Sequence, residues 1–306
     1  MRGRQEFFVS SANYSVRKYV CLEEVIIMKD MGEKLGRTLA IALLVGAGSV
    51  ISAVSAVPDC LQAAEAASAA AERQEHIQEV AGNALVTVRQ HNVALRDYQG
   101  RELHTGKYLE LAAKPGASYA LRRSLARWND AECTRWAGDE KMLRNAVHFT
   151  EENGIPMYAP YYMGHAIAGW GRVDDAVLSF CTRTESYTGG AHPNHAYQSW
   201  NLDLRTGEPI ALRDIVTSRR AFLTAVAAAF RAQYPGREDE TFRRTIDAQL
   251  ESIYPYLDWD QSTVWIMLPG GGIRVYYSAY ELAPYAAGDF ILTLMPEGNP
   301  GLFKAR

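Results

Sequence analysis

The feature that most constrains this chain is a stretch without charge near its N-terminus. No charged residue occurs from Thr38 to Pro58, and basic residues precede the stretch. A basic segment, an apolar run and small residues at its exit are the three parts of a secretory signal peptide. The Gly- and Ser-rich second half favours a cleaved signal over a retained membrane anchor, which needs about 20 apolar residues. Both interpretations place the residues after 57 outside the cytoplasm, in the periplasm or the medium.

This stretch divides the chain into segments of different composition. We expect residues 1–37 to form an N-terminal extension with a basic n-region, and residues 38–57 to form the apolar run. Residues 58–84 are Ala-rich, and we interpret them as a leader or tether. Seven of the 32 basic and five of the 35 acidic residues precede Pro58, which leaves a net charge of −5 on the exported part. An acidic domain attracts cationic partners and repels nucleic acid.

Hydrophobic periodicity predicts the secondary structure after residue 84. Period-two segments predict strands at residues 85–88, 93–95, 102–111, 161–170, 176–182, 197–204, 263–268, 273–277 and 290–294. Helical periodicity falls between these runs. Hairpins outnumber βαβ patterns, so the fold class is α+β, with antiparallel sheets packed with helices in two consecutive subdomains.

Two regions have helical periodicity. Apolar residues recur at three- or four-residue spacing over residues 118–147, with a break expected near Gly138. Residues 219–253 form a second helical region that is interrupted at Pro235, and its second apolar stripe begins at Phe242. We interpret five arginines of the first helix as a solvated face; they are Arg122, Arg123, Arg127, Arg135 and Arg144.

The cysteines fit an exported protein. Cys60, Cys133 and Cys181 follow the apolar stretch, and disulfides persist in oxidising compartments. An odd number predicts one pair and one spare thiol. Cys133 and Cys181 are the preferred pair because both lie inside the predicted fold.

The sequence holds few signs of catalysis. No serine lies in a Gly-x-Ser-x-Gly motif, and the glycines at 270–272 lead into a strand rather than a helix, which a phosphate cradle needs. His192 and His195 form a His-x-x-His pair. Asp203 and Glu185 are the only nearby acids, so the set falls short of a zinc site. We expect no catalytic residue, no metal and no cofactor, and we favour a protein that is not an enzyme.

Several segments resemble the exported domain of RsiV-type anti-sigma proteins. They are Tyr187–Pro193, Asp203–Gly207, Ile210–Ile215 and Tyr280–Phe290. That domain is catalogued as a DUF4163 unit followed by a DUF3298 unit. Residues 85–208 resemble the first unit and residues 209–298 the second, in the same order and spacing.

The resemblance implies an extracytoplasmic α+β binding module that is not itself catalytic. RsiV-type domains bind lysozyme through loops that enter its cleft, so the implied partner is a cationic protein such as lysozyme, or peptidoglycan. The residues that the resemblance nominates for binding are Thr188, Gly189, Gly190, His192, Pro193, Tyr280 and Tyr285.

Two other functions stay open at this point. A membrane-anchored anti-sigma sensor of lysozyme or envelope stress requires residues 38–57 as an anchor and residues 1–37 as its cytoplasmic segment. A peptidoglycan-active hydrolase or deacetylase accessory domain is the other alternative, although the Thr-Phe-Asp-Asp-Gly motif of the deacetylases is absent. No nucleic-acid partner is expected, and membrane contact is expected only with a retained anchor.

Overall fold

The computed structural model describes residues 72–254 and 259–305, which form two sheets and their helices. The strands are β1 (Glu72–Val80), β2 (Val86–Arg96), β3 (Glu102–Ala113), β4 (Tyr161–Val173), β5 (Val177–Tyr187), β6 (Asn194–Asp203), β7 (Val264–Met267), β8 (Ile273–Tyr277) and β9 (Phe290–Leu294). The helices are α2 (Tyr119–Glu152), α3 (Leu212–Ile215), α4 (Arg219–Gln233), α5 (Ile246–Ile253) and α6 (Trp259–Ser262).

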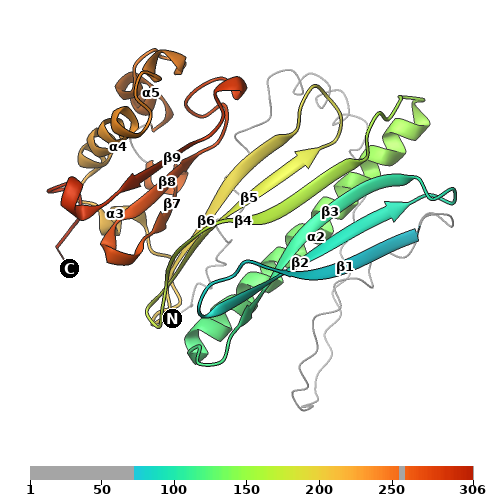
Figure 1. The fold of residues 1–306 in the computed structure, drawn as a ribbon, viewed down its shortest axis with the longest axis horizontal. Coiled ribbons are helices and arrows are strands. Elements are labelled where there is room, and N and C mark those ends of the chain that lie inside the picture. The colour runs from blue at the N-terminus through green and yellow to red at the C-terminus, as the bar shows by residue number, and fades with distance from the viewer. Residues whose placement is uncertain (1–71, 255–258, 306) are drawn as a thin grey trace, which may run out of the picture. The chain divides into compact units, whose positions relative to one another are not determined.

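The first sheet has six strands in the order β1-β2-β3-β4-β5-β6, and the second has three in the order β7-β8-β9 (Figure 1). The predicted α+β class with two consecutive subdomains is confirmed. One junction of the large sheet differs from the expected antiparallel pattern, because β3 and β4 are parallel and α2 connects them. The predicted signal or anchor at residues 38–57 lies outside the described residues. Within the described ranges, no helix is long and apolar enough to cross a membrane.

Strand β1 is an edge strand within the segment that the sequence analysis assigned to a tether. It pairs antiparallel with β2, from Glu72 opposite Arg96 to Val80 opposite Val88. Residues 72–80 therefore belong to the sheet. The strand is mostly polar and largely exposed, so it has none of the apolar alternation that reveals a strand in a sequence. Charge on an edge strand also opposes pairing with other chains.

Helix α2 lies in the seam between β3 and β4. The two strands pair only along His104–Lys107 of β3, and beyond this point polar side chains of α2 satisfy the open edge of β3. The Asn129 amide oxygen accepts the Leu111 N–H at 2.9 Å, and its amide nitrogen donates to the Leu111 carbonyl at 3.0 Å. The helix thus supplies the hydrogen bonds that a neighbouring strand would otherwise make.

Glu132 connects α2 to both strands of the seam. Its carboxylate accepts the Leu109 N–H of β3 at 3.1 Å, the Nδ1–H of His165 on β4 at 2.8 Å, and the Arg135 guanidinium at 2.8 Å. The side chains of Glu132 and His165 are only 3% and 2% exposed. Burial favours the neutral acid, but Arg135 and His165 outweigh it and hold the pKa of Glu132 at about 2. One buried carboxylate therefore joins α2 to both β3 and β4. It accepts from a backbone amide, an imidazole and a guanidinium.

Helix α2 is longer and less solvated than predicted. It begins after its N-cap Ser118 and runs for 34 residues, through Gly138, without the expected break. A single glycine costs a helix about 1 kcal/mol, which contacts with the sheet easily offset. Arg135 and Arg144, expected on a solvated face, instead bond to buried carboxylates of the same helix.

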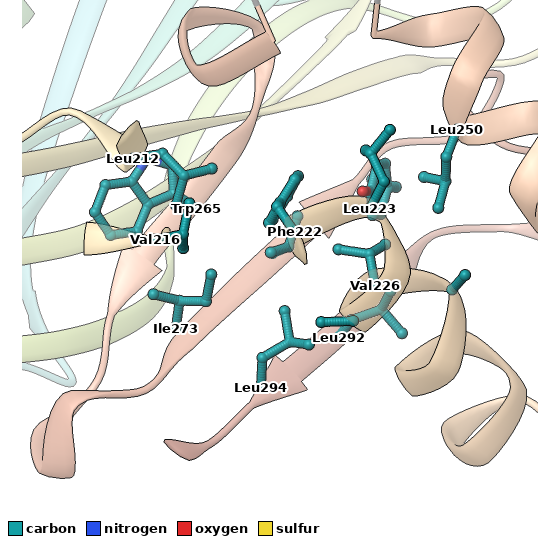
Figure 2. Close-up of a cluster of buried hydrophobic side chains, with 14 of the residues drawn as sticks. Leu212, Val216, Phe222, Leu223, Val226, Leu250, Trp265, Ile273, Leu292 and Leu294 are labelled. Carbon is teal, nitrogen blue, oxygen red and sulfur yellow. The ribbon is translucent and has the colours of Figure 1, made fainter. Parts of the chain in front are cut away.

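A hydrophobic core lies between α4 and the three-stranded sheet. Figure 2 shows the cluster, to which α4 contributes Phe222, Leu223 and Val226 and β9 contributes Leu292 and Leu294. Phe222, Val226 and both β9 leucines are fully buried. Burial of a large apolar side chain stabilises the fold by about 1.5–3 kcal/mol for each residue.

The second helical stripe starts later than predicted. Helix α5 begins at Ile246, which is fully buried. Phe242 precedes the helix and its side chain is 50% exposed. Its backbone N–H instead donates to the Leu282 carbonyl at 3.1 Å. Phe242 has the spacing of the helical stripe, four residues before Ile246, but its backbone is not helical.

The predicted disulfide between Cys133 and Cys181 is wrong. Cys181 is a free, buried thiol, and Cys133 is disulfide-bonded. The two remaining cysteines, Cys21 and Cys60, lie outside the described residues. Cys181 packs in a cluster contributed by both sheets, where burial raises the pKa of its thiol. A thiol in this state is inert.

We expect Glu132→Gln to remove a pH-dependent part of the stability. The pKa of this carboxyl is about 2 in the folded chain and near 4.5 in the unfolded chain. Its ionised form therefore stabilises the fold above about pH 4.5, and this contribution is lost as the pH falls towards 2. Chemical denaturation at pH 7 should show a loss of about 3 kcal/mol in the free energy of unfolding.

The wild type and the variant should converge in stability as the pH falls. The matched control is Glu102→Gln, which breaks a surface pair with Arg96 and should cost less than about 0.5 kcal/mol. A stability difference between wild type and Glu132→Gln that stays constant from pH 7 to pH 2 would contradict the role given to this carboxylate.

We expect the two cysteines of the fold to differ in labelling. Under non-reducing conditions, iodoacetamide should modify Cys181 only after unfolding, because the native thiol is buried and protonated. Cys133 should react only after a reductant is added. Peptide mass spectrometry separates these outcomes, and a label on Cys133 without reductant would refute its disulfide.

Candidate functional site

Two loops, one from each sheet, contain the residues that the resemblance nominates. They are the loop between β5 and β6 and the loop of residues 278–289 between β8 and β9, which we call the second loop. The loop between β5 and β6 contains Thr188, Gly189 and Gly190, which are exposed. Its His192 ring stacks on Tyr285, with centroids 3.9 Å apart and an interplanar angle of 18°. These residues are far apart in sequence, so the fold brings them together.

The β5–β6 loop has a defined shape. Gly189 and Gly190 have φ of 104° and 105°, values that side-chain-bearing residues rarely adopt. The Tyr187 hydroxyl donates to the Gly190 carbonyl at 3.3 Å, and the Nδ1–H of His192 donates to the Pro193 carbonyl at 2.9 Å. These bonds turn the imidazole towards the second loop.

Tyr280 contacts His192 from the second loop. Its hydroxyl lies 3.2 Å from Nε2 of His192, and its ring lies 5.7 Å from that of Tyr285. Tyr280 has φ of 69°, one of two positive values among the described non-glycine residues, and 47% of its surface is exposed. A bulky residue in this region costs about 1–3 kcal/mol, and such strain clusters at functional sites.

Asp289 fastens the second loop to β6. Its carboxylate accepts a hydrogen bond from Nε2 of His195 at 2.5 Å, from the Tyr197 hydroxyl at 2.8 Å and from the Ala279 N–H at 3.0 Å. Burial acts to raise the pKa of Asp289, but the bonds from His195 and Tyr197 prevail and lower it. The carboxylate is therefore ionised at neutral pH and holds the second loop against β6.

Two further tyrosines extend the site along β4 and β5. The rings of Tyr162 and Tyr187 lie 6.0 Å apart. The Tyr187 hydroxyl bonds to the β5–β6 loop at Gly190, so Tyr187 connects Tyr162 to that loop. Burial, followed by the negative charge of Glu185, raises the pKa of Tyr162. We call the set Tyr162, Tyr187, His192, Tyr280 and Tyr285 the aromatic face.

The His-x-x-His pair does not gather a metal site. His192 is held by the tyrosines of the aromatic face, and His195 by Asp289. Asp203 lies at the far end of β6, where Arg205 lowers the pKa of its carboxyl to about 2. Glu185 pairs with Arg183. Over residues 72–254 and 259–305, no group of three or more His, Cys, Asp or Glu side chains is arranged to hold a metal ion.

Sequence reasoning missed Asp289 and the role of His195. Asp289 lies inside the Tyr280–Phe290 segment that carried the resemblance, but a single aspartate before a strand gives no signal of its partner. His195 was considered only as a metal ligand. The signal available was the alternation of β6, which places His195 and Tyr197 on the same side of the strand.

No protein-family model and no curated protein sequence matches this chain. Among solved structures, it is similar to a DUF3298 family member from Bacteroides fragilis NCTC 9343, with 17% identity and a TM-score of 0.48, over 77% of this chain and 94% of that one. It is also similar to a DUF3298 family protein from Pseudomonas aeruginosa PAO1, with 17% identity and a TM-score of 0.40, over 76% and 94%. These neighbours are DUF3298 family proteins at low sequence identity.

We expect Asp289→Asn to loosen the contact between the two loops. The amide keeps the shape of the side chain but removes the charge that His195 and Tyr197 bond, which should cost about 1–2 kcal/mol of unfolding free energy. Hydrogen exchange should accelerate at the amides of residues 187–193 and 278–289. The matched control is Asp130→Asn on the exposed side of α2, and equal exchange in both variants would refute the fastening role.

Proposed function

We propose that this chain is an exported, non-catalytic binding module of the DUF3298 type, whose aromatic face binds a cationic protein such as lysozyme. The observation that carries the proposal is Tyr280. Its half-exposed ring is held on a left-handed backbone where glycine would be free of strain. We take the backbone strain at Tyr280 as a sign that the position of its ring serves binding.

The neighbours of Tyr280 support a preformed binding surface. His192 is fixed by its bonds to Pro193 and Tyr280 and by its stack on Tyr285. Rings that are already ordered lose little conformational entropy on binding, so more of their contact energy appears as affinity. Tyrosine is among the residue types that contribute most at protein interfaces.

The charge around the aromatic face supports a cationic partner. Three carboxylates, those of Glu185, Glu281 and Asp289, lie in or beside the two loops. Two guanidinium groups lie beside them: that of Arg183, which pairs with Glu185, and that of Arg237, which donates to the Ala287 carbonyl. The exported part of the chain is acidic as a whole. Complementary charge accelerates encounter and suppresses partners of the same sign.

The resemblance to RsiV-type domains supports the same face. Two of the segments that carry it, Tyr187–Pro193 and Tyr280–Phe290, supply four of the five residues of the aromatic face. Lysozyme is the partner that the resemblance implies, and a strongly basic protein suits an acidic, aromatic surface.

The first test is retention on immobilised lysozyme. The wild-type chain should be retained at low ionic strength and released as the salt concentration rises, because charge contributes to the complex. Failure to bind at low salt would contradict the proposal that lysozyme is the partner. Surface plasmon resonance on the same pair then supplies the dissociation constant that the variants below require.

We expect Tyr280→Gly to weaken lysozyme binding without destabilising the fold. Loss of a central aromatic side chain should raise the dissociation constant by about tenfold or more. Relief of the left-handed strain should offset the lost ring contacts, so the free energy of unfolding should stay within about 1 kcal/mol of wild type. The control is Tyr98→Ala, which removes a tyrosine that is 79% exposed on another turn. Unchanged affinity in Tyr280→Gly would place the binding site elsewhere.

A further inference from the structure

Side chains at the end of α4 close the outer edge of β9. Strand β9 pairs with β8 on one side only and lies beside α4 (Figure 1). The Gln233 amide accepts the Thr293 N–H at 3.1 Å and donates to the Thr293 carbonyl at 2.9 Å. The Tyr234 hydroxyl accepts the Ile291 N–H at 2.9 Å and donates to the Ile291 carbonyl at 3.3 Å. Two side chains therefore make four hydrogen bonds that a neighbouring strand would otherwise make.

The end of α4 holds these two side chains in place, and we call Gln233 and Tyr234 the edge cap. Gln233 is the last residue of the helix and Tyr234 is its C-cap. The Tyr234 ring packs between Phe230 and Phe290, with centroids 5.7 and 5.1 Å away. The Arg237 guanidinium lies 4.7 Å from the Phe290 ring centroid. The edge cap is thus fixed by packing, whereas its bonds are made at the edge of the sheet.

The sequence of β9 explains why its edge needs a cover. Residues 290–295 read Phe-Ile-Leu-Thr-Leu-Met and contain neither a charge nor a proline. Short segments of high β-propensity and no charge pair readily with other strands when an edge is open. The edge strand β1 carries charged side chains, among them Glu75 and Glu79, and β9 has none. The edge cap takes the place of this protection.

The open edge of β9 would be complementary to itself. In an antiparallel pair of two copies with Leu292 on the two-fold axis, Ile291 of one copy faces Thr293 of the other. Each such pair exchanges two hydrogen bonds, so the dimer would use the same four backbone groups of each copy that the edge cap now satisfies. Both facing residues are β-branched, which favours a cross-strand pair. The contact is isologous, so it closes as a dimer and does not extend into a fibre.

We propose that the edge of β9 is an interface for a second copy of this chain, and that the edge cap keeps the chain monomeric by occupying it. The cap prevails in the wild type because its bonds form within one chain, whereas a dimer must offset the lost translation and rotation of two molecules. A strand without charge also gives no selectivity for a charged partner, which favours the identical strand. The inference does not depend on the function proposed for the aromatic face.

The test is analytical ultracentrifugation of the purified full chain over a concentration series. The wild type should remain monomeric. Gln233→Ala/Tyr234→Ala should dimerise, with a dissociation constant about tenfold or more below any that the wild type shows, because the edge bonds no longer compete. The matched control is Tyr98→Ala/Gln99→Ala, which removes an exposed Tyr–Gln pair from the turn between β2 and β3. The control should remain monomeric.

Hydrogen exchange locates the contact. The amides of Ile291 and Thr293 should exchange faster in the dilute double variant than in the wild type, and they should become protected again as the dimer forms. A folded double variant that stays monomeric at every concentration would overturn the proposal. So would a dimer in which these two amides stay unprotected, because its contact would lie elsewhere.

The single variant Gln233→Ala decides the matter if the double variant does not fold. The Gln233 side chain is exposed, so its loss leaves the core intact and frees only the backbone groups of Thr293. Gln233→Ala should self-associate at lower concentration than Gln99→Ala, with protection of the Thr293 amide in the associated form. Equal behaviour of these two variants would overturn the proposal.

Discussion

The carboxylate of Glu132 is the interaction on which the large sheet depends. A sheet that opens between two strands exposes unpaired backbone groups, and burying them without partners is costly. Glu132 and Asn129 fill this need from a helix, and His165 binds the other side of the gap. Because the carboxylate is buried, loss of any of its donors would leave a buried charge without compensation, and loss of the carboxylate would leave the donors unpaired.

Buried polar side chains also join the two sheets. Asn201 on β6 donates to the Trp265 carbonyl on β7 at 2.7 Å, and the Ser179 hydroxyl on β5 accepts the Met267 N–H at 2.8 Å. Asp289 adds a further connection next to the aromatic face. Hydrogen bonds of this kind are directional, so they set the position of one sheet on the other, and with it the meeting of the two loops.

The parts of the fold that sequence reasoning found are those encoded locally. The turn at Asp97–Gly100 and the hairpin at Pro269–Gly272 follow from residues that are neighbours in the chain. Strand β1 was missed because its pattern is polar. Glu132 and His165 are 33 residues apart, and a glutamate in an amphipathic helix ordinarily faces solvent. The site was found only in part, because the loops were visible in the sequence and the bonds from Asp289 to β6 were not.

The position of α2 also has a consequence for folding during synthesis. Strands β1, β2 and β3 are consecutive, whereas β4 meets β3 only after the 34 residues of the helix. Since α2 completes the edge of β3, we expect the helix to dock before β4 finds its register, which makes this a slow, long-range step. A nascent chain that ends before β4 presents a half-open sheet, and this is the kind of surface on which chaperones act.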